Sequence, residues 1–220
     1  MNKPLAPYNL LLVMCGSLNP ITIAHLRLFF DAKAAFSHQY SVIKGILSPV
    51  NDAYRSFKFG KPVLIDGHHR VNMCRAATED IDWITVDTFE MEQDHYVRTY
   101  EYLCHLTDEY PLAEWDIRFV CGVDLLSTFK PEIWNNCVNI INEFGFVAFE
   151  RKGYPTVEEV VEENPILRKN SHHILTATSP CSNSISSTVV RDLVRRNDSP
   201  RFLVADRVLD YINNNQLYIE

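Results

Sequence analysis

The sequence predicts an α/β fold with a mostly parallel sheet flanked by helices on both faces. Short runs rich in β-branched and aromatic residues alternate along the chain with segments whose apolar residues recur at three- and four-residue spacing. This alternation is typical of βαβ units, which place helices over both faces of a parallel sheet. The chain has 220 residues, 46 % of them hydrophobic and 22 % charged, so we expect one globular domain spanning residues 1–220.

The expected elements alternate from one end of the chain to the other. The predicted strands are residues 9–14, 41–47, 83–86, 117–121, 145–149 and 172–175. The predicted helices are residues 22–36, 67–78, 93–107, 157–163 and 186–196. Parallel sheets bind ligands beyond the carboxyl ends of their strands, so we expect the loops that follow the strands to carry the functional residues.

The net charge, the apolar runs and the cysteines of the sequence exclude some classes of protein. The net charge of −7 argues against general nucleic-acid binding, because such binding draws most of its affinity from basic surface. No apolar run is long enough to span a membrane, and the six cysteines form no CxxC pair, so we expect reduced thiols and a cytoplasmic protein. An anionic ligand must then be met by a local cluster of positive groups.

The loop after the first predicted strand has the features of a phosphate-binding turn. Gly16 permits close approach of the backbone to a ligand, and Pro20 suits the start of a helix. Thr22 and His25 are three residues apart, so they share one helical face. The N-terminus of a helix offers free N–H groups to a phosphate, and His25 adds a further donor. Taken alone, this segment is equally consistent with a simple strand-to-helix turn.

A second helix start with similar chemistry follows the last predicted strand. Ser186 or Ser187 can cap this helix, and Arg191 lies on the same helical face as Ser187 and Thr188. Taken alone, the segment is more typical of a purely structural helix start. Both segments, however, begin helices at strand ends, carry hydroxyl groups, and place one His or Arg at a spacing that suits a polyphosphate.

Together the two segments resemble the two signatures of the nucleotidylyltransferase superfamily, in the form found in eukaryotic nicotinamide/nicotinic acid mononucleotide adenylyltransferases. The motifs that carry the resemblance are Gly16-Ser17-x-Asn19-Pro20-x-Thr22-x-x-His25 and Ile185-Ser186-Ser187-Thr188-x-x-Arg191. Stretches between them follow the family's order, among them His69-Arg70-Val71 and Cys121-Gly122-Val123-Asp124. The resemblance implies a Rossmann-like fold and the transfer of AMP from ATP to nicotinamide mononucleotide, which yields NAD and pyrophosphate.

The resemblance also implies roles for individual residues. His25 and Arg191 would stabilise the charge that grows on the α- and β-phosphate oxygens, without a general base. Further ATP or NAD contacts are implied for Gly16, Ser17, Lys58, Gly122, Asp124, Arg151, Asn183, Ser186, Ser187 and Thr188. Which cation of residues 55–61 contacts the phosphate is left open by the sequence, and Lys58 is the first choice. Contacts to the nicotinamide nucleotide are implied for Tyr54, Tyr96, Thr99, Ile133 and Trp134. Without the resemblance, Trp134 is more simply a core residue, and Arg151 and Asn183 are surface loop residues.

The implied ligands are ATP, nicotinamide mononucleotide, nicotinic acid mononucleotide, NAD and pyrophosphate. Mg²⁺ would bridge the phosphates of ATP, held largely by the nucleotide and by water. The sequence leaves open which mononucleotide is preferred and whether the chain forms a homo-oligomer. The pairs His68-His69 and His172-His173 do not indicate a metal site in the protein, because no third ligand stands at a zinc-like spacing.

Two other functions stay open at this point. Another transferase of the superfamily, acting on phosphopantetheine or making a CDP-alcohol, would carry the same two signatures, but Tyr96, Thr99 and Trp134 favour a nicotinamide nucleotide. A non-catalytic nucleotide-binding or chaperone-like relative would keep the fold. The presence of both His25 and Arg191 favours a working enzyme instead.

Overall fold

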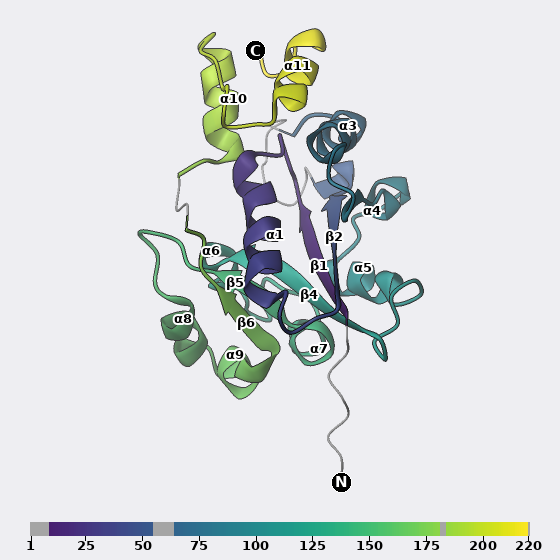
Figure 1. Ribbon diagram of the computed structural model, residues 1–220, viewed down its shortest axis with the longest axis vertical. Helices are drawn as coiled ribbons and strands as arrows, with labels where there is room; N and C mark the ends of the chain where they lie inside the picture. The colour runs from purple at the N-terminus through teal and green to yellow at the C-terminus, as the bar shows by residue number, and fades with distance from the viewer. Residues whose placement is uncertain (1–8, 55–63, 181–183, 220) are drawn as a thin grey trace. The chain divides into compact units, whose positions relative to one another are not determined.

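A computed structural model describes residues 9–54, 64–180 and 184–219 (Figure 1). Six strands form one sheet in the order β3-β2-β1-β4-β5-β6. The strands are β1 (Asn9–Gly16), β2 (Val42–Pro49), β3 (Ile84–Val86), β4 (Trp115–Gly122), β5 (Phe146–Phe149) and β6 (Ile174–Ala177). The predicted strands are therefore all present, with ends that differ from the predicted ends by at most two residues.

The sheet confirms the predicted fold class. β1 pairs with β4, β4 with β5 and β5 with β6, in each case parallel. The strand order is that of the Rossmann fold, and helices connect and flank the strands. Leu10, Leu11 and Leu12 of β1 are fully buried although successive side chains point to opposite faces. Both faces of this strand are therefore covered, as expected for a parallel sheet.

The helices occupy most of the connections between strands. They are α1 (Ile23–Phe36), α3 (Gly67–Thr78), α4 (Phe89–Glu92), α5 (Thr99–Leu106), α6 (Val123–Leu126), α7 (Cys137–Asn139), α8 (Val157–Glu163), α9 (Pro165–Lys169), α10 (Ser187–Arg195) and α11 (Asp206–Asn214). Short turns of other helical types cover Asp52–Tyr54, Ile140–Phe144 and Ser171–His173. The sequence analysis did not predict α11, whose buried Val208, Leu209 and Ile212 pack beside α3.

The prediction of one helix over residues 93–107 is wrong in its first part. α4 ends at Glu92, the backbone of Gln93 is extended, and α5 begins only at Thr99. The amide of Asn51 donates to the carbonyl oxygens of Glu90 and Gln93, at 3.1 and 2.6 Å. These carbonyls lie where α4 ends, so the side chain of Asn51 supplies donors to backbone acceptors at the end of this helix.

Local capping explains where several helices begin. Thr156 and Glu159 form a reciprocal capping box at the start of α8. The side chain of Asn164 accepts hydrogen bonds from the N–H groups of Ile166 and Leu167, and Pro165 is the first residue of α9. These contacts satisfy backbone donors that have no partner inside the helix.

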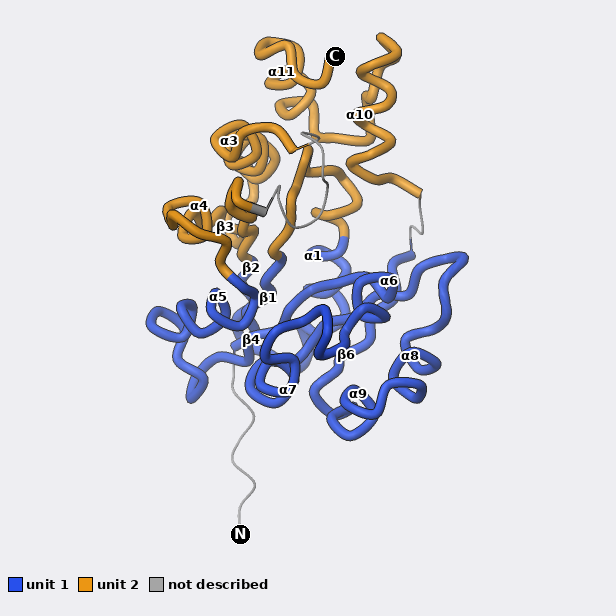
Figure 2. Tube along the Cα trace, turned by 180° about the vertical axis from the view of Figure 1, so that it is seen from behind, with its two compact units in different colours: residues 1–14, 28–45, 98–182 blue, residues 15–27, 46–97, 183–220 orange. Residues whose placement is uncertain are grey.

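The chain divides into two compact units (Figure 2). Unit 1 comprises residues 1–14, 28–45 and 98–182, and unit 2 comprises residues 15–27, 46–97 and 183–220. Unit 1 contains β4, β5 and β6, while unit 2 contains the turn after β1 and the helices α3, α4, α10 and α11. The expectation of one domain over residues 1–220 stays a prediction.

Candidate active site

The turn after β1, residues 16–20, is held through its carbonyl oxygens within unit 2. The carbonyl of Gly16 accepts the N–H of Val50 at 3.0 Å, and the carbonyl of Ser17 accepts Nη1 of Arg70 at 3.1 Å. In a trans peptide the C=O and the following N–H point in opposite directions. The N–H groups of Ser17 and Leu18 are therefore directed away from these partners, which is the orientation that a backbone phosphate site requires.

Two side chains of helix α10 bind the carbonyls of Asn19 and Pro20, the last two residues of the same turn. The hydroxyl of Ser187 donates to the carbonyl of Pro20 at 2.7 Å. Nη1 of Arg191 donates to the carbonyl of Asn19 at 2.7 Å, and its Nη2 donates to Oγ1 of Thr188 at 3.2 Å. The two sequence signatures, which are more than 160 residues apart, are thus in direct contact.

The guanidinium of Arg191 supplies positive charge to this turn. Arg191 is only 8 % exposed, and this burial lowers its pKa, although an arginine remains protonated in proteins. Its Nε is buried without a hydrogen-bond partner, and in the described residues Arg191 forms no ion pair. With no carboxylate paired to it, the charge is available to attract an anion to the turn.

The structure separates the roles of the neighbouring hydroxyl residues. The sequence left open whether Ser186 or Ser187 caps α10; Oγ of Ser186 accepts the N–H of Val189 at 3.3 Å and is the cap. Ser187 uses its hydroxyl proton on Pro20, and Thr188 is exposed. Their predicted contacts with ATP stay predictions.

His25 is half-buried at the start of α1, with a defined ring orientation. The N–H of Thr22 donates to Nδ1 of His25 at 3.0 Å, and the hydroxyl of Thr22 lies 2.8 Å from the same nitrogen. Because a backbone N–H can only donate, Nδ1 is the acceptor, and in the neutral ring the proton is on Nε2. Nε2 is thus the nitrogen of His25 that can donate to a phosphate oxygen.

The first N–H groups at the start of α1 are not all available. The sequence analysis expected them to be free, but the N–H of Thr22 is used by His25. The N–H of Ile23 donates to the carbonyl of Leu203 at 2.9 Å. The expectation is wrong for these two groups, because a loop distant in sequence and a side chain of the helix supply acceptors.

In unit 1, two residues predicted separately form one ion pair. Nη1 of Arg151 lies 2.7 Å from Oδ2 of Asp124, and both side chains are partly exposed. A Cβ added at Gly122 would collide with Oδ1 of Asp124. Because Gly122 has no side chain, the carboxylate of Asp124 can lie close to the backbone at the end of β4.

Trp134 lies at the edge of the core of unit 1. Its indole is half-buried and makes edge contacts with Phe119, Phe129 and Phe146, at centroid distances of 5.8, 5.3 and 6.3 Å. Its Nε1 donates to Oγ1 of Thr128 at 3.1 Å, which fixes the direction of the ring. The core interpretation thus holds for part of the indole, and the predicted nicotinamide contact stays a prediction.

The remaining predicted residues are dispersed. Tyr96 is half-buried in the extended segment before α5, Thr99 is the first residue of α5, and Ile133 is 62 % exposed. Tyr54 ends a short helical turn. Lys58 and Asn183 lie outside the described residues.

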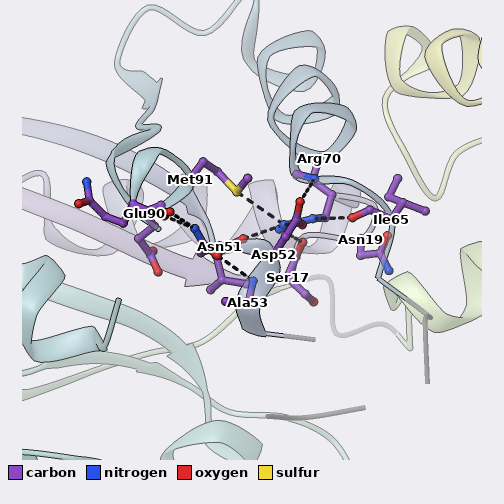
Figure 3. A network of polar contacts seen from close by, with 12 residues as sticks. Ser17, Asn19, Asn51, Asp52, Ala53, Ile65, Arg70, Glu90 and Met91 are labelled. Carbon is purple, nitrogen blue, oxygen red and sulfur yellow. Dashed lines mark hydrogen bonds and ion pairs between the residues drawn. The ribbon is translucent and has the colours of Figure 1, made fainter. Parts of the chain in front are cut away.

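A buried polar network behind the turn was not predicted (Figure 3). Its centre is Arg70, whose side chain is fully buried, and beside it Glu90 is 2 % exposed and accepts the hydroxyl of Ser48 at 2.6 Å. Arg70 lies three and seven residues before the buried Met73 and Ala77, so the sequence already placed an arginine on the apolar face of a helix. No comparable signal marked Glu90.

Comparisons with known proteins show the family to which the chain belongs. Residues 13–193 match the family described as Cytidylyltransferase-like, so the chain is a nucleotidyltransferase of that family. It is 34 % identical to the nicotinamide/nicotinic acid mononucleotide adenylyltransferase of Arabidopsis thaliana, over 95 % of this chain and 90 % of the relative. It is 31 % identical to nicotinamide/nicotinic acid mononucleotide adenylyltransferase 1 of Bos taurus, over 94 % and 88 %. The chain therefore belongs to the nicotinamide/nicotinic acid mononucleotide adenylyltransferases.

Solved structures agree on the fold. The nicotinic acid mononucleotide adenylyltransferase of Plasmodium falciparum complexed with NaAD has a TM-score of 0.71 at 19 % identity, over 96 % of this chain and 97 % of that chain. The same enzyme complexed with APC has a TM-score of 0.70 at 18 % identity, over 95 % and 96 %. At this level of identity the likeness concerns the fold alone.

The buried carboxyl of Glu90 predicts a pH-dependent stability. Burial raises its pKa from 4.5 to about 7, so the folded protein keeps a proton that the unfolded chain releases between these values. The contribution of Glu90 to stability is present below pH 4.5 and is lost as the pH rises through 7. Glu90→Gln should remove this loss, stabilising the protein at pH 8 by on the order of 3 kcal/mol and much less at pH 5. Urea unfolding of the wild type and of Glu90→Gln at pH 5 and pH 8 measures the difference in the free energy of unfolding. The same difference at both pH values would contradict the raised pKa of Glu90.

Proposed function

We propose that the protein transfers the adenylyl group of ATP to nicotinamide mononucleotide and to nicotinic acid mononucleotide, forming NAD or its deamido form and pyrophosphate. The observation that carries this proposal is the direct contact between the two signature segments, where Ser187 and Arg191 bind the carbonyls of Pro20 and Asn19. That contact holds a guanidinium that forms no ion pair among the described residues, and His25 and the backbone N–H groups of Ser17 and Leu18 belong to the same unit. The names of the relatives agree with the proposed reaction.

In the proposed reaction, a phosphate oxygen of the mononucleotide attacks the α-phosphorus of ATP. The new P–O bond forms as the bond to the β-phosphate breaks, and pyrophosphate leaves. The protein needs no general base, because the attacking oxygen is already anionic. Positioning of the reactants and stabilisation of the growing charge provide most of the rate in such transfers.

The proposed phosphate contacts come from unit 2. His25 donates through Nε2, and Arg191 provides charge from its buried position. The backbone of Gly16 and Ser17 and the start of α10, with Ser186, Ser187 and Thr188, complete the set, together with Lys58 and Asn183. Arg191 also holds the carbonyl of Asn19, so the same side chain stabilises charge and fixes the turn.

The proposed contacts to the sugar and the nicotinamide ring come mainly from unit 1. Asp124 is suited to accept hydrogen bonds from ribose hydroxyls, with Gly122 beneath it and Arg151 beside it. Trp134 offers an aromatic face to the nicotinamide ring, with Ile133 next to it. Tyr54, Tyr96 and Thr99 are the further proposed contacts.

Mg²⁺ is the proposed metal. In the described part of the chain, no group of three His, Cys, Asp or Glu side chains forms a metal cage. The proposed ion would be held mainly by the phosphates of ATP and by water, as Mg²⁺ commonly is. When bound, the ion neutralises phosphate charge and thereby eases attack on the α-phosphorus.

Location, assembly and domain organisation stay predictions. In the part of the chain that the structure describes, no helix has the length and apolar character needed to cross a membrane. The cytoplasmic location stays an expectation from the sequence alone. Homo-oligomer formation and a single domain over residues 1–220 rest on the resemblance and on length.

The direct test of the proposed function uses purified protein with ATP, Mg²⁺ and each mononucleotide in turn. We expect NAD from nicotinamide mononucleotide, the deamido dinucleotide from nicotinic acid mononucleotide, and one pyrophosphate for each dinucleotide. The ratio of the two kcat/KM values gives the preference. The proposed function would be overturned if neither mononucleotide gave pyrophosphate while another phosphate acceptor, or CTP in place of ATP, did. The chain would then be another transferase of the wider superfamily.

His25→Ala should remove most turnover while the fold survives. The imidazole donates to charge that is larger in the transition state than in the substrate, so kcat should fall roughly a hundredfold or more. The exposed His38 provides the matched control, and His38→Ala should leave kcat unchanged. Steady-state kinetics with a thermal melt measures both, and wild-type turnover in a folded His25→Ala protein contradicts the phosphate-site assignment.

Trp134→Ala should weaken binding of nicotinamide mononucleotide by on the order of 1–3 kcal/mol, by analogy with bases stacked on aromatic side chains, and ATP much less. The melting temperature should also fall, because the indole packs on three phenylalanines. Trp115, which packs edge-on against Tyr110 in the same unit, is the control for loss of an indole. Separate titrations of the two ligands decide the matter. Equal weakening of both, as expected for Trp115→Ala, would make Trp134 a core residue only.

A further inference from the structure

We propose that Arg70 is a positioning residue for the transfer reaction: it sets the orientation of the backbone N–H groups in the turn after β1 and ties that turn to the loop after β2. This inference rests on the proposed function, because it concerns how the phosphate-binding turn is held. Arg70 does not touch substrate in this proposal. It acts through Ser17 on one side and Asp52 on the other.

The guanidinium of Arg70 donates to four acceptors on three segments of unit 2: the turn after β1, the loop after β2 and the residues before α3 (Figure 3). Nη1 donates to the carbonyl of Ser17 at 3.1 Å, and Nε donates to the carbonyl of Ile65 at 3.2 Å. Nη2 donates to the carbonyl of Val50 at 2.7 Å and to Oδ1 of Asp52 at 2.8 Å. The side chain is fully buried, so water cannot replace any of these bonds.

The bond to Ser17 determines the direction of one peptide plane. The carbonyl of Ser17 and the N–H of Leu18 belong to the same planar group and point in opposite directions. By holding the carbonyl, Arg70 directs the N–H of Leu18 away from itself. Leu18 has a φ of 42°, in the left-handed region, a conformation found in backbone turns that bind anions.

The bonds to Val50 and Asp52 link this turn to a second predicted contact region. Asp52 opens the short turn that ends at Tyr54, a residue predicted to contact the mononucleotide. The other oxygen of Asp52, Oδ2, accepts the N–H of Gly67 at 3.0 Å, which also fixes the start of α3. One guanidinium thus controls the separation of the phosphate turn and the start of the mononucleotide loop.

The packing around the guanidinium leaves little freedom for it to move. A Cβ added at Gly67 would collide with Met91 and would lie 3.2 Å from Nη2 of Arg70. Sδ of Met91 lies 3.6 Å from the same nitrogen. A side chain at position 67 would therefore require the end of Met91 to move and would press on the guanidinium.

A lysine cannot replace this arrangement. Arg presents five N–H donors in a rigid planar fork, while Lys has one nitrogen with three donors on a flexible stem. A single ammonium nitrogen cannot reach the carbonyls of Ser17, Val50 and Ile65 and also the carboxylate of Asp52. Arg70→Lys keeps the positive charge but loses some of the hydrogen bonds to the turn. The variant therefore distinguishes the effect of holding the turn from the effect of the charge.

The test compares Arg70→Lys with a matched control, Arg118→Lys. Arg118 is also a buried arginine, at 9 % exposure, but it is paired with Asp116 and with the carbonyl of His173 in unit 1. We expect both variants to melt at lower temperatures. Well below those temperatures, kcat should fall roughly tenfold to a hundredfold for Arg70→Lys, because small misplacements of reacting groups slow such steps strongly. The KM values should change much less, and Arg118→Lys should keep the wild-type kcat.

Asp52→Ala is the second variant, and it decides the matter if Arg70→Lys does not fold. Asp52 is partly exposed, and its loss removes one of the two bonds between Arg70 and the loop after β2, while the bond to the carbonyl of Val50 remains. We expect a smaller fall in kcat in the same direction. Wild-type kcat in whichever of the two variants folds would overturn the inference and leave the proposed function standing. A wild-type protein that makes no dinucleotide would overturn the proposed function and this inference together.

Discussion

The arrangement of unit 2 depends on how the carbonyl oxygens of the turn 16–20 are satisfied. Four of its five carbonyls accept hydrogen bonds from other parts of the chain, and buried carbonyls without partners would cost free energy. Meeting this requirement brings together β2, α3 and α10, which are far apart in sequence. The donors are the N–H of Val50, the guanidinium groups of Arg70 and Arg191, and the hydroxyl of Ser187.

The same bonds explain how an acidic protein can bind a polyphosphate. The net charge of −7 repels anions at long range, so attraction must come from charge placed close to the ligand. Arg191 binds a carbonyl and a hydroxyl, which orient its guanidinium without neutralising it. Arg70 differs, since its charge faces Asp52 directly and Glu90 nearby. This difference supports the proposed roles, electrostatic attraction for Arg191 and alignment for Arg70, although both are buried arginines that hold the same turn.

Much of the fold and part of the site could be predicted from the sequence, for reasons that are local. Strands and the cap at Ser186 follow from short-range patterns, and parallel topology brings their ends to one edge of the sheet. What failed depended on long-range partners. Asn51 binds carbonyls at the end of α4 from about 40 residues away, the carbonyl of Leu203 accepts the N–H of Ile23, and the hydroxyl of Ser187 donates to Pro20. No periodicity encodes such contacts, because the acceptors are backbone groups that every residue type carries.

The two groups of predicted contacts differ in how firmly they are held, and the difference fits the chemistry. In unit 2, the turn is fixed by buried donors, so its N–H dipoles need not reorganise when charge moves to the leaving pyrophosphate; fixed dipoles are what make electrostatic stabilisation effective. In unit 1, Asp124 and Arg151 form a partly exposed pair, whose net energy is small in water. Such a pair can open at little cost, as the proposed hydrogen bond from a ribose hydroxyl to Asp124 would require. We propose that the firmly held turn serves to stabilise growing charge and that the adjustable pair serves to recognise the sugar.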